Sequence, residues 1–483
     1  MQPWLGRRHQ AFFPGGLRRG LGPAAYVARG PAADQILTMT RHLFAAASIL
    51  LIGACATLQR APAGTDAPAC CTRDAFRDVL ADAGRYRNPG ISTRQFTHRE
   101  FWTVVDGSIK APSARVAIIG QSLLGRDINA VTFGDGPTRV LLWSQMHGDE
   151  STATMALADI FRFLSEAIES PLRQRLLREL TLVFVPMLNP DGAEVFQRQN
   201  AAGIDVNRDA RRLATPEARA LKALRDAVQP RFGFNLHDQN ARTRAGENGV
   251  PSGIALLPPA YDEGKSYNEV RQRARLVAAT LATAFAYAIP GRVAKYDDEY
   301  NPRAFGDLMQ QWGTSTVLIE SGALPDDPEK QRLRALNFAG ILLALDAIAT
   351  GGYEEADASA YERLPFNEGG AFDLLVRGGH LVLPGKPPMQ ADVAINYDDA
   401  VARTGGRLRE VGDLADVVAI DTIEAGGLYL HLGPGAMSIT PAGLMLRLGA
   451  FADIAARRGP DPASELLRRI AEPPTSGEAQ PLR

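Results

Sequence analysis

The chain is poor in cysteine and carries almost no net charge. Only three of its 483 residues are cysteine, so a disulfide framework is excluded. Its 53 Lys and Arg residues are balanced by 54 Asp and Glu residues, a formal net charge of −1 at pH 7. Phosphate backbones are bound through an excess of basic residues, so we exclude nucleic acid as a partner. Apolar residues make up 45% of the chain, which is enough for at least one large core.

Long apolar runs are also scarce near the N-terminus. The run at residues 43–52 is too short to span a bilayer as a stable helix, but it suits the apolar part of a signal peptide. Arg41 precedes it, and small residues lead from it to Cys55, as in a bacterial lipobox. We therefore predict a signal peptide at residues 39–55, lipidation of Cys55, and export to the bacterial periplasm or outer membrane. A secretory signal with an incidental cysteine is the alternative interpretation.

The remaining segments divide the chain into a disordered part, a linker and two domains. Residues 1–38 are rich in Gly, Pro, Arg and Ala, which indicates either disorder or a misassigned start upstream of Met39. Residues 56–75 have the Ala/Pro-rich composition of a linker. Residues 76–352 form the expected catalytic domain, and residues 365–483, rich in Gly and short β-like runs, form a smaller β-rich C-terminal accessory domain that includes a helical run near 440–457.

Within the catalytic domain, short β-rich runs alternate with stretches of helical spacing. We expect strands at residues 114–122, 128–134, 138–145, 180–188, 231–237 and 315–321, and helices at residues 150–168, 215–228, 267–285 and 328–349. The helix at 215–228 has a clear start, with Thr215 as N-cap and Pro216 in the first position. This alternation predicts an α/β fold with a mixed, mostly parallel central sheet covered by helices.

Four chemically active side chains come at or just after the ends of three apolar strands of this domain. His147 and Glu150 lie three positions apart just after the run at 140–143, and His237 and Glu320 come at the ends of two further strands. Sites in such sheets lie at the carboxyl ends of strands. Imidazole and carboxylate are zinc ligands, and a catalytic site uses three of them and leaves one position open. The spacing therefore favours a divalent metal site over a polar loop that only caps a helix.

Two further segments carry residues suited to binding and catalysis. The loop at residues 189–209 holds Arg198 and the pair Asn207 and Arg208, and a guanidinium group suits bidentate binding of a carboxylate. Glu320 stands at the end of an apolar strand, where a carboxylate is costly unless it is paired or functional. Near a metal it could act as a general base. Solvated arginines and a turn-capping glutamate are the alternative interpretations.

Five segments, in this order, resemble the zinc carboxypeptidase family, the M14 metallopeptidases or funnelins, of the bacterial type. They are "IGQSLLGRDI" at 119–128, "HGDE" at 147–150, "NPDGAEVFQRQNAAGIDVNRD" at 189–209, "NLHDQ" at 235–239 and "LIESG" at 318–322. The resemblance covers residues 85–350. One departure is Asp149, where the animal digestive members usually carry Arg, so the resemblance does not carry over one peptide-backbone contact of that group.

The resemblance implies a set of metal ligands and their support. His147, Glu150 and His237 would hold one Zn²⁺ per chain. Asp205 would orient His147 through the ring nitrogen that does not bind the metal, the usual arrangement for a ligating imidazole.

The resemblance also implies the residues that act on the substrate. Asn207 and Arg208 would grip its carboxylate, and Arg198 would stabilise the oxyanion of the tetrahedral intermediate. Glu320 would serve as general base and then as acid. The mobile substrate-binding tyrosine of the family corresponds to Tyr300, with Tyr296 as the other candidate.

The predicted function is zinc-dependent hydrolysis of a peptide bond near a free carboxylate, at the C-terminal residue of a peptide or of a cell-wall peptide. The partners expected are such a peptide and, through a lipid on Cys55, a membrane. Two alternatives stay open at this point. One is a zinc-dependent deacylase of N-acyl amino acids on the same fold, and the other is a peptide-binding lipoprotein without catalysis.

Overall fold

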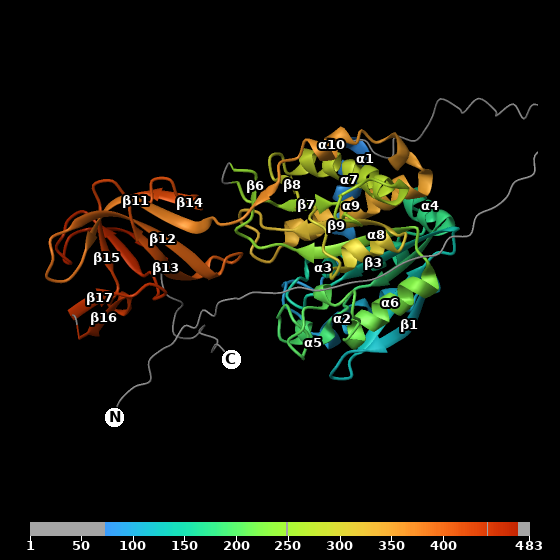
Figure 1. Ribbon diagram of the computed structural model, residues 1–483, viewed down its shortest axis with the longest axis horizontal. Helices are drawn as coiled ribbons and strands as arrows, with labels where there is room; N and C mark the ends of the chain where they lie inside the picture. The colour runs from blue at the N-terminus through green and yellow to red at the C-terminus, as the bar shows by residue number, and fades with distance from the viewer. Residues whose placement is uncertain (1–72, 248–249, 442, 472–483) are drawn as a thin grey trace, which may run out of the picture. The chain divides into compact units, whose positions relative to one another are not determined.

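The computed structural model describes residues 73–247, 250–441 and 443–471. The predicted signal peptide, Cys55 and the segment at 1–38 lie outside the described residues, as do all but the end of the predicted linker. The described residues comprise an α/β domain and a β-rich C-terminal region (Figure 1).

An eight-stranded mixed sheet forms the centre of the α/β domain, in the order β1-β2-β4-β3-β5-β9-β7-β8. The strands are β1 (Ala114–Gln121), β2 (Asp127–Phe133), β3 (Thr138–Ser144), β4 (Leu180–Val185), β5 (Phe232–Asp238), β7 (Ile254–Leu257), β8 (Val293–Lys295) and β9 (Ser315–Ser321). The four central strands β4, β3, β5 and β9 run parallel, whereas β1, β2 and β7 join by antiparallel pairing. The predicted mixed, mostly parallel sheet is therefore confirmed.

Strand β3 shows why both faces of this sheet are covered. Its side chains alternate between two cores: Val140 and Leu142 belong to one, and Leu141 and Trp143 to the other, all fully buried. A strand buried on both faces needs a continuous apolar run, which is what this segment has.

Helices cover the two faces of the sheet unequally (Figure 1). The larger core is built with α1 (Arg73–Tyr86), α2 (His98–Ile109), α3 (Thr152–Glu166), α4 (Pro171–Glu179), α7 (Glu269–Ala288) and α9 (Gln331–Thr350), and the smaller with α6 (Pro216–Val228) and α8 (Phe305–Gln311). Among the described residues, α9 is the one helix long and apolar enough to cross a membrane, but 83% of that stretch is buried inside the fold. We therefore read α9 as a core helix.

The helix starts follow from local hydrogen bonding. In α6 the Thr215 side chain accepts from the backbone N–H of Ala218, as the sequence predicted. Helix α2 begins with a capping box in which Thr97 and Glu100 satisfy each other's backbone N–H groups, a start that the sequence analysis missed. Short turns complete the domain: α5 (Pro190–Glu194), η1 (Val206–Arg208), η2 (Gly352–Glu355), α10 (Ser359–Glu362), and the paired strands β6 (Arg244–Ala245) and β10 (Asn367–Glu368).

The C-terminal region contains strands, as predicted, but no helix at 440–457. Its seven-stranded sheet comprises β11 (Phe372–Val382), β12 (Met389–Asp399), β13 (Thr404–Gly412), β14 (Ala419–Glu424), β15 (Tyr429–Leu432), β18 (Ile454–Arg457) and β19 (Leu466–Ile470). The predicted helix is wrong, because the segment forms the hairpin of β16 (Met437–Thr440) and β17 (Gly443–Leu446), followed by β18. Gly443 and Gly449 have φ angles of 109° and 85°, which a helix does not accommodate.

Candidate metal centre and active site

Three parallel strands bring the predicted site residues to one edge of the sheet. His147 and Glu150 follow the end of β3, His237 lies near the end of β5, and Glu320 near the end of β9. His237 and Glu320 are direct partners in the β5–β9 register. The neighbouring β3–β5 ladder ends at Ser144 and Leu236, so the turn that carries His147 starts beside the strand that carries His237.

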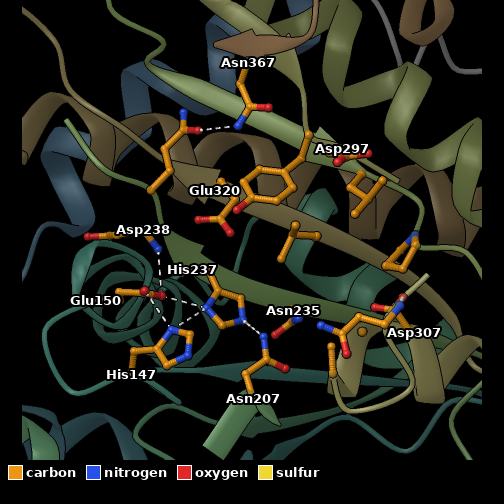
Figure 2. A pocket seen from close by; sticks show the side chains of 18 of the residues that line it. His147, Glu150, Asn207, Asn235, His237, Asp238, Asp297, Asp307, Glu320 and Asn367 are labelled. Atoms are coloured by element: carbon orange, nitrogen blue, oxygen red, sulfur yellow. Dashed lines mark hydrogen bonds and ion pairs between the residues drawn. The ribbon is translucent and has the colours of Figure 1, made fainter. Parts of the chain in front are cut away.

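The donor atoms of His147, Glu150 and His237 all lie within 4.8 Å of one another, and the three side chains are buried. Nδ1 of His147 is 2.7 Å from Oε1 of Glu150, and Nδ1 of His237 is 2.7 Å from Oε2 of the same carboxylate (Figure 2). The two Nδ1 atoms are 3.2 Å apart. Two nitrogens bound to one tetrahedral zinc at 2.0–2.1 Å lie about 3.3 Å apart, so this donor set fits the ion.

The other ring nitrogens of both histidines are held by neighbouring side chains. Nε2 of His147 is 2.9 Å from Oδ1 of Asp205, which leaves Nδ1 of His147 for a metal. Nε2 of His237 faces Nδ2 of Asn207 at 3.5 Å. The predicted role of Asp205 in orienting His147 therefore has the required contact.

Opposing effects set the charge states of these groups in the absence of a metal. Burial lowers the pKa of His147, but the carboxylates of Glu150 and Asp205 outweigh burial and raise that pKa to about 9. Burial raises the pKa of Glu150, yet the two imidazoles hold it well below the ordinary carboxyl value. For His237, burial prevails and lowers its pKa. The site thus prefers one protonated imidazole, one neutral imidazole and one carboxylate.

Arg198 lies against the metal ligands and is fixed by Asp205. Its Nε and Nη2 atoms donate to Oδ2 of Asp205 at 3.1 and 2.9 Å, and Nη1 donates to Oε1 of Glu150 at 3.0 Å. The side chain keeps 38% of its surface exposed. A fixed cation that reaches both the ligands and the solvent-filled pocket is suited to developing negative charge there.

Glu320 is a buried carboxylate that forms no ion pair in the described part of the chain. It is 8% exposed, and its Oε2 atom has no hydrogen-bonding partner among the described residues. Burial and the nearby carboxylate of Glu150 raise its pKa well above the ordinary value. A carboxylate in such surroundings holds a proton readily, which is the property required of a general base and acid.

A cavity of about 470 Å³ opens in front of these residues. His147, Glu150, Arg198, Asn207, Arg208, His237, Glu320, Tyr296 and Tyr300 all line it. Asn207 Oδ1 accepts from the backbone N–H of Phe305 at 2.9 Å, which leaves its amide nitrogen toward His237. Arg208 is held by its own Nη1, which donates to the carbonyl of Asn207 at 2.8 Å. The structure therefore brings together every residue that the sequence analysis assigned to metal and substrate.

The two tyrosines have different surroundings. The pKa of Tyr296 is raised to about 12, first by the charge of Glu320 and then by burial. Burial also raises the pKa of Tyr300, where the charges acting on the phenol come from Asp307, Arg211 and Asp262. The charge of Glu320 thus reaches the phenol of Tyr296, and both tyrosines line the cavity.

The sequence analysis missed several residues that line the cavity. Among them are Asn235, Asp307 and Asn367, and Figure 2 shows Asn367 at the top of the view, away from the other two. Asn235 stands two positions before His237 on β5, so strand alternation could have placed its side chain on the same face of the sheet. The sequence does not indicate that Asp307 or Asn367 lines the cavity. Asp307 stands at the start of α8 and Asn367 on the distant strand β10, and only the tertiary structure brings them to the site.

Comparisons with known proteins were consistent with this geometry. Residues 108–241 match the family model described as zinc carboxypeptidase (Peptidase_M14), which confirms the resemblance drawn from the five motifs. The matched residues include the three metal-ligand candidates and Arg198, Asn207 and Arg208. Glu320 lies beyond them and joins the site through β9.

Individual relatives cover smaller parts of the chain. Carboxypeptidase 2 of Trichophyton rubrum is 30% identical over 103 residues, 21% of this chain and 19% of the relative. Carboxypeptidase SOL1 of Arabidopsis thaliana is 28% identical over 103 residues, 20% of this chain and 21% of the relative. The chain thus spans about a fifth of the length of the curated relatives it matches.

Solved structures include a metallo-carboxypeptidase from Burkholderia cenocepacia, with 21% identity and a TM-score of 0.44, covering 54% of this chain and 70% of that one. Carboxypeptidase A from Helicoverpa armigera has 16% identity and a TM-score of 0.41, covering 58% of this chain and 80% of that one.

Proposed function

Because residues 108–241 match the zinc carboxypeptidase family, we propose that this protein is a zinc-dependent hydrolase that cleaves a peptide bond near a free carboxylate. The observation that carries the proposal is the pairing of His237 with Glu320 across β5 and β9. It sets an unpartnered carboxylate beside a complete zinc ligand set at the wall of one cavity.

His147, Glu150 and His237 would hold the zinc ion. When bound there, zinc supplies a Lewis acid that polarises a carbonyl and makes water more acidic. The protein supplies the proton transfers. Glu320 takes the proton of the attacking water at Oε2 and then delivers it to the amine that leaves.

Two arginines bind two different negative groups: the oxyanion of the intermediate and the carboxylate of the substrate. Arg198, held in place by Asp205, faces the oxygen that becomes negative when water attacks the carbonyl. Arg208 has Nε and Nη2 free of partners among the described residues, so with the amide of Asn207 it can bind the substrate's carboxylate. The carboxylate fixes the substrate, and the fixed substrate places its terminal peptide bond at Glu320.

The test is a peptide library that varies the C-terminal residue, combined with metal analysis of the purified protein. We expect about one zinc per chain and release of the C-terminal residue. Glu320→Gln should retain the metal and lose turnover by a factor of about 10²–10⁴. Undiminished peptide cleavage by Glu320→Gln with metal bound would contradict the proposal. Cleavage of N-acyl amino acids in preference to every peptide would favour the deacylase.

We also propose export through residues 39–55 and attachment to a membrane by a lipid on Cys55. The sequence pattern of small residues before Cys55 supports this. Cys55→Ala should move the protein from the membrane fraction to the soluble fraction of the cell envelope. Mass spectrometry of the N-terminal peptide should show the lipid only in the unaltered protein.

A further inference from the structure

The segment at residues 365–368 lies outside the family match and forms part of the cavity wall. Pro365 accepts a hydrogen bond at 2.8 Å from the backbone N–H of Lys295, at the end of β8. The carbonyl of Phe366 accepts from Gly246 at 2.9 Å, and Asn367 pairs with Ala245 of β6. The segment is thus held by backbone bonds to two parts of the α/β domain.

These bonds place the Asn367 side chain in the cavity. Its Nδ2 donates to Oε1 of Gln239 at 3.2 Å (Figure 2). Nε2 of Gln239 donates in turn to the Ser252 hydroxyl at 2.9 Å. Gln239 is only 8% exposed and is itself hydrogen-bonded to Ser252, so it holds the Asn367 side chain in place. Oδ1 of Asn367 has no partner among the described residues and stays available as an acceptor.

The cavity wall that contains Asn367 includes uncharged side chains that can both donate and accept hydrogen bonds. Gln239, Asn240, Thr243 and Asn367 line it together. Figure 2 shows Asn367 on the side of Glu320 and His237 opposite to Asn207. A peptide that is held by its carboxylate at Asn207 and passes Glu320 would extend toward Asn367, which lines the same cavity. Its main chain presents amide N–H and C=O groups, which side-chain amides match without charge.

We propose that Asn367, fixed by Gln239, forms a subsite for the peptide main chain on the amino side of the bond that is cleaved. The inference rests on the proposed function, and it names a substrate class: peptides longer than a dipeptide. It also gives the segment that leads into the C-terminal region a part in substrate selection.

The test compares Asn367→Ala with the unaltered protein on a dipeptide and a tetrapeptide that share their two C-terminal residues. Loss of one neutral hydrogen bond should lower kcat/KM for the tetrapeptide by a factor of about three to ten, mainly through KM. The dipeptide should be cleaved at an unchanged rate. Asn129→Ala, a half-buried asparagine on β2 outside this cavity, serves as the matched control and should change neither value.

Two results would overturn the subsite. An equal loss on both substrates would show that Asn367 only maintains the cavity, and no loss on either would show that it makes no contact. If the unaltered protein cleaves no peptide, the proposed function fails, but the subsite remains testable by binding. Calorimetry of the tetrapeptide with Glu320→Gln, with and without Asn367→Ala, should then show weaker binding for the double variant. Equal affinities would refute the subsite.

Discussion

Glu320 and His237 are adjacent partners on two parallel strands, and Oε2 of Glu320 has no hydrogen-bonding partner among the described residues. A buried carboxyl group with a raised pKa lowers the free energy of unfolding at any pH where the unfolded chain ionises it. As the pH rises, the unfolded chain loses this proton before the folded chain does, so stability falls from the ordinary carboxyl range up to the raised pKa.

We therefore expect Glu320→Gln to stabilise the metal-free protein, although the same change lowers turnover. The gain should be about 1–3 kcal/mol at pH 8 and should vanish near pH 4, where Glu320 is protonated in both states. Urea unfolding at the two pH values measures it. Glu217→Gln is the control: Glu217 accepts from Leu123 and Asn200, so this change should destabilise the protein. A Glu320→Gln variant less stable at pH 8 would contradict the expectation.

Metal binding should release a proton. In the metal-free protein the pKa of His147 is about 9, so this imidazole is protonated at pH 7 and must lose its proton to bind zinc. We expect release of about one proton at pH 7 and a roughly tenfold rise in zinc affinity per pH unit from pH 6 to 8. Calorimetry in two buffers with different ionisation enthalpies measures the release.

Asp205→Asn is the control variant for the proton that His147 releases when zinc binds. The change removes one of the carboxylates that raise the pKa of His147, so fewer protons should be released at pH 8. A heat of binding that does not depend on the buffer would contradict the prediction.

Lys330 and Asp238 form a buried ion pair beside the candidate metal ligands. Lys330 Nζ lies 3.0 Å from Oδ2 of Asp238, with 5% and 8% of the two side chains exposed. The same carboxylate oxygen accepts from Thr152, and the Asp238 backbone N–H donates to Glu150. Burial raises the pKa of Asp238, and the charge of Lys330 opposes this effect.

Lys330→Met should destabilise the protein by about 3–5 kcal/mol, because it leaves a buried carboxylate uncompensated. Adding Asp238→Asn should restore part of the loss, since that carboxylate is then neutral. Urea unfolding of the two single variants and the double variant gives the coupling. A double variant no more stable than Lys330→Met would show that the pair is not coupled.

Asp307 should make stability depend on pH in the mildly acidic range. Burial raises its pKa to about 6, above the unfolded value. The folded state therefore holds this proton longer, and stability is lost as the pH rises from about 4 to 6. Asp307→Asn keeps an acceptor for the backbone N–H of Asn301 and removes the charge. We expect it to be more stable than the unaltered protein at pH 7, by about 1–3 kcal/mol, and equal at pH 4. A constant difference across this range would contradict the assignment.

The sequence predicted the parts of the site that depend on strand ends. His147, His237 and Glu320 follow apolar strands, and parallel pairing then brings them to one edge. Asn367 could not be found in this way, because 128 residues separate it from Gln239 and only tertiary structure joins them. The sequence predicts a helix at the C-terminal hairpin because the apolar residues there can also share one face of a helix. The positive φ of Gly443, which a helix does not allow, accompanies the pairing of β16 with β17 and cannot be read from the sequence.

Gly148 stands between the two ligands of the "HGDE" motif, and the backbone of another turn presses against it. A Cβ atom built there would lie 2.0 Å from the carbonyl carbon of Gly192, at the start of the loop that leads to Arg198. The two turns touch through their main chains, so no larger residue can be accommodated at position 148. Libraries that randomise the "HGDE" motif should consequently return glycine at position 148 in every folded variant.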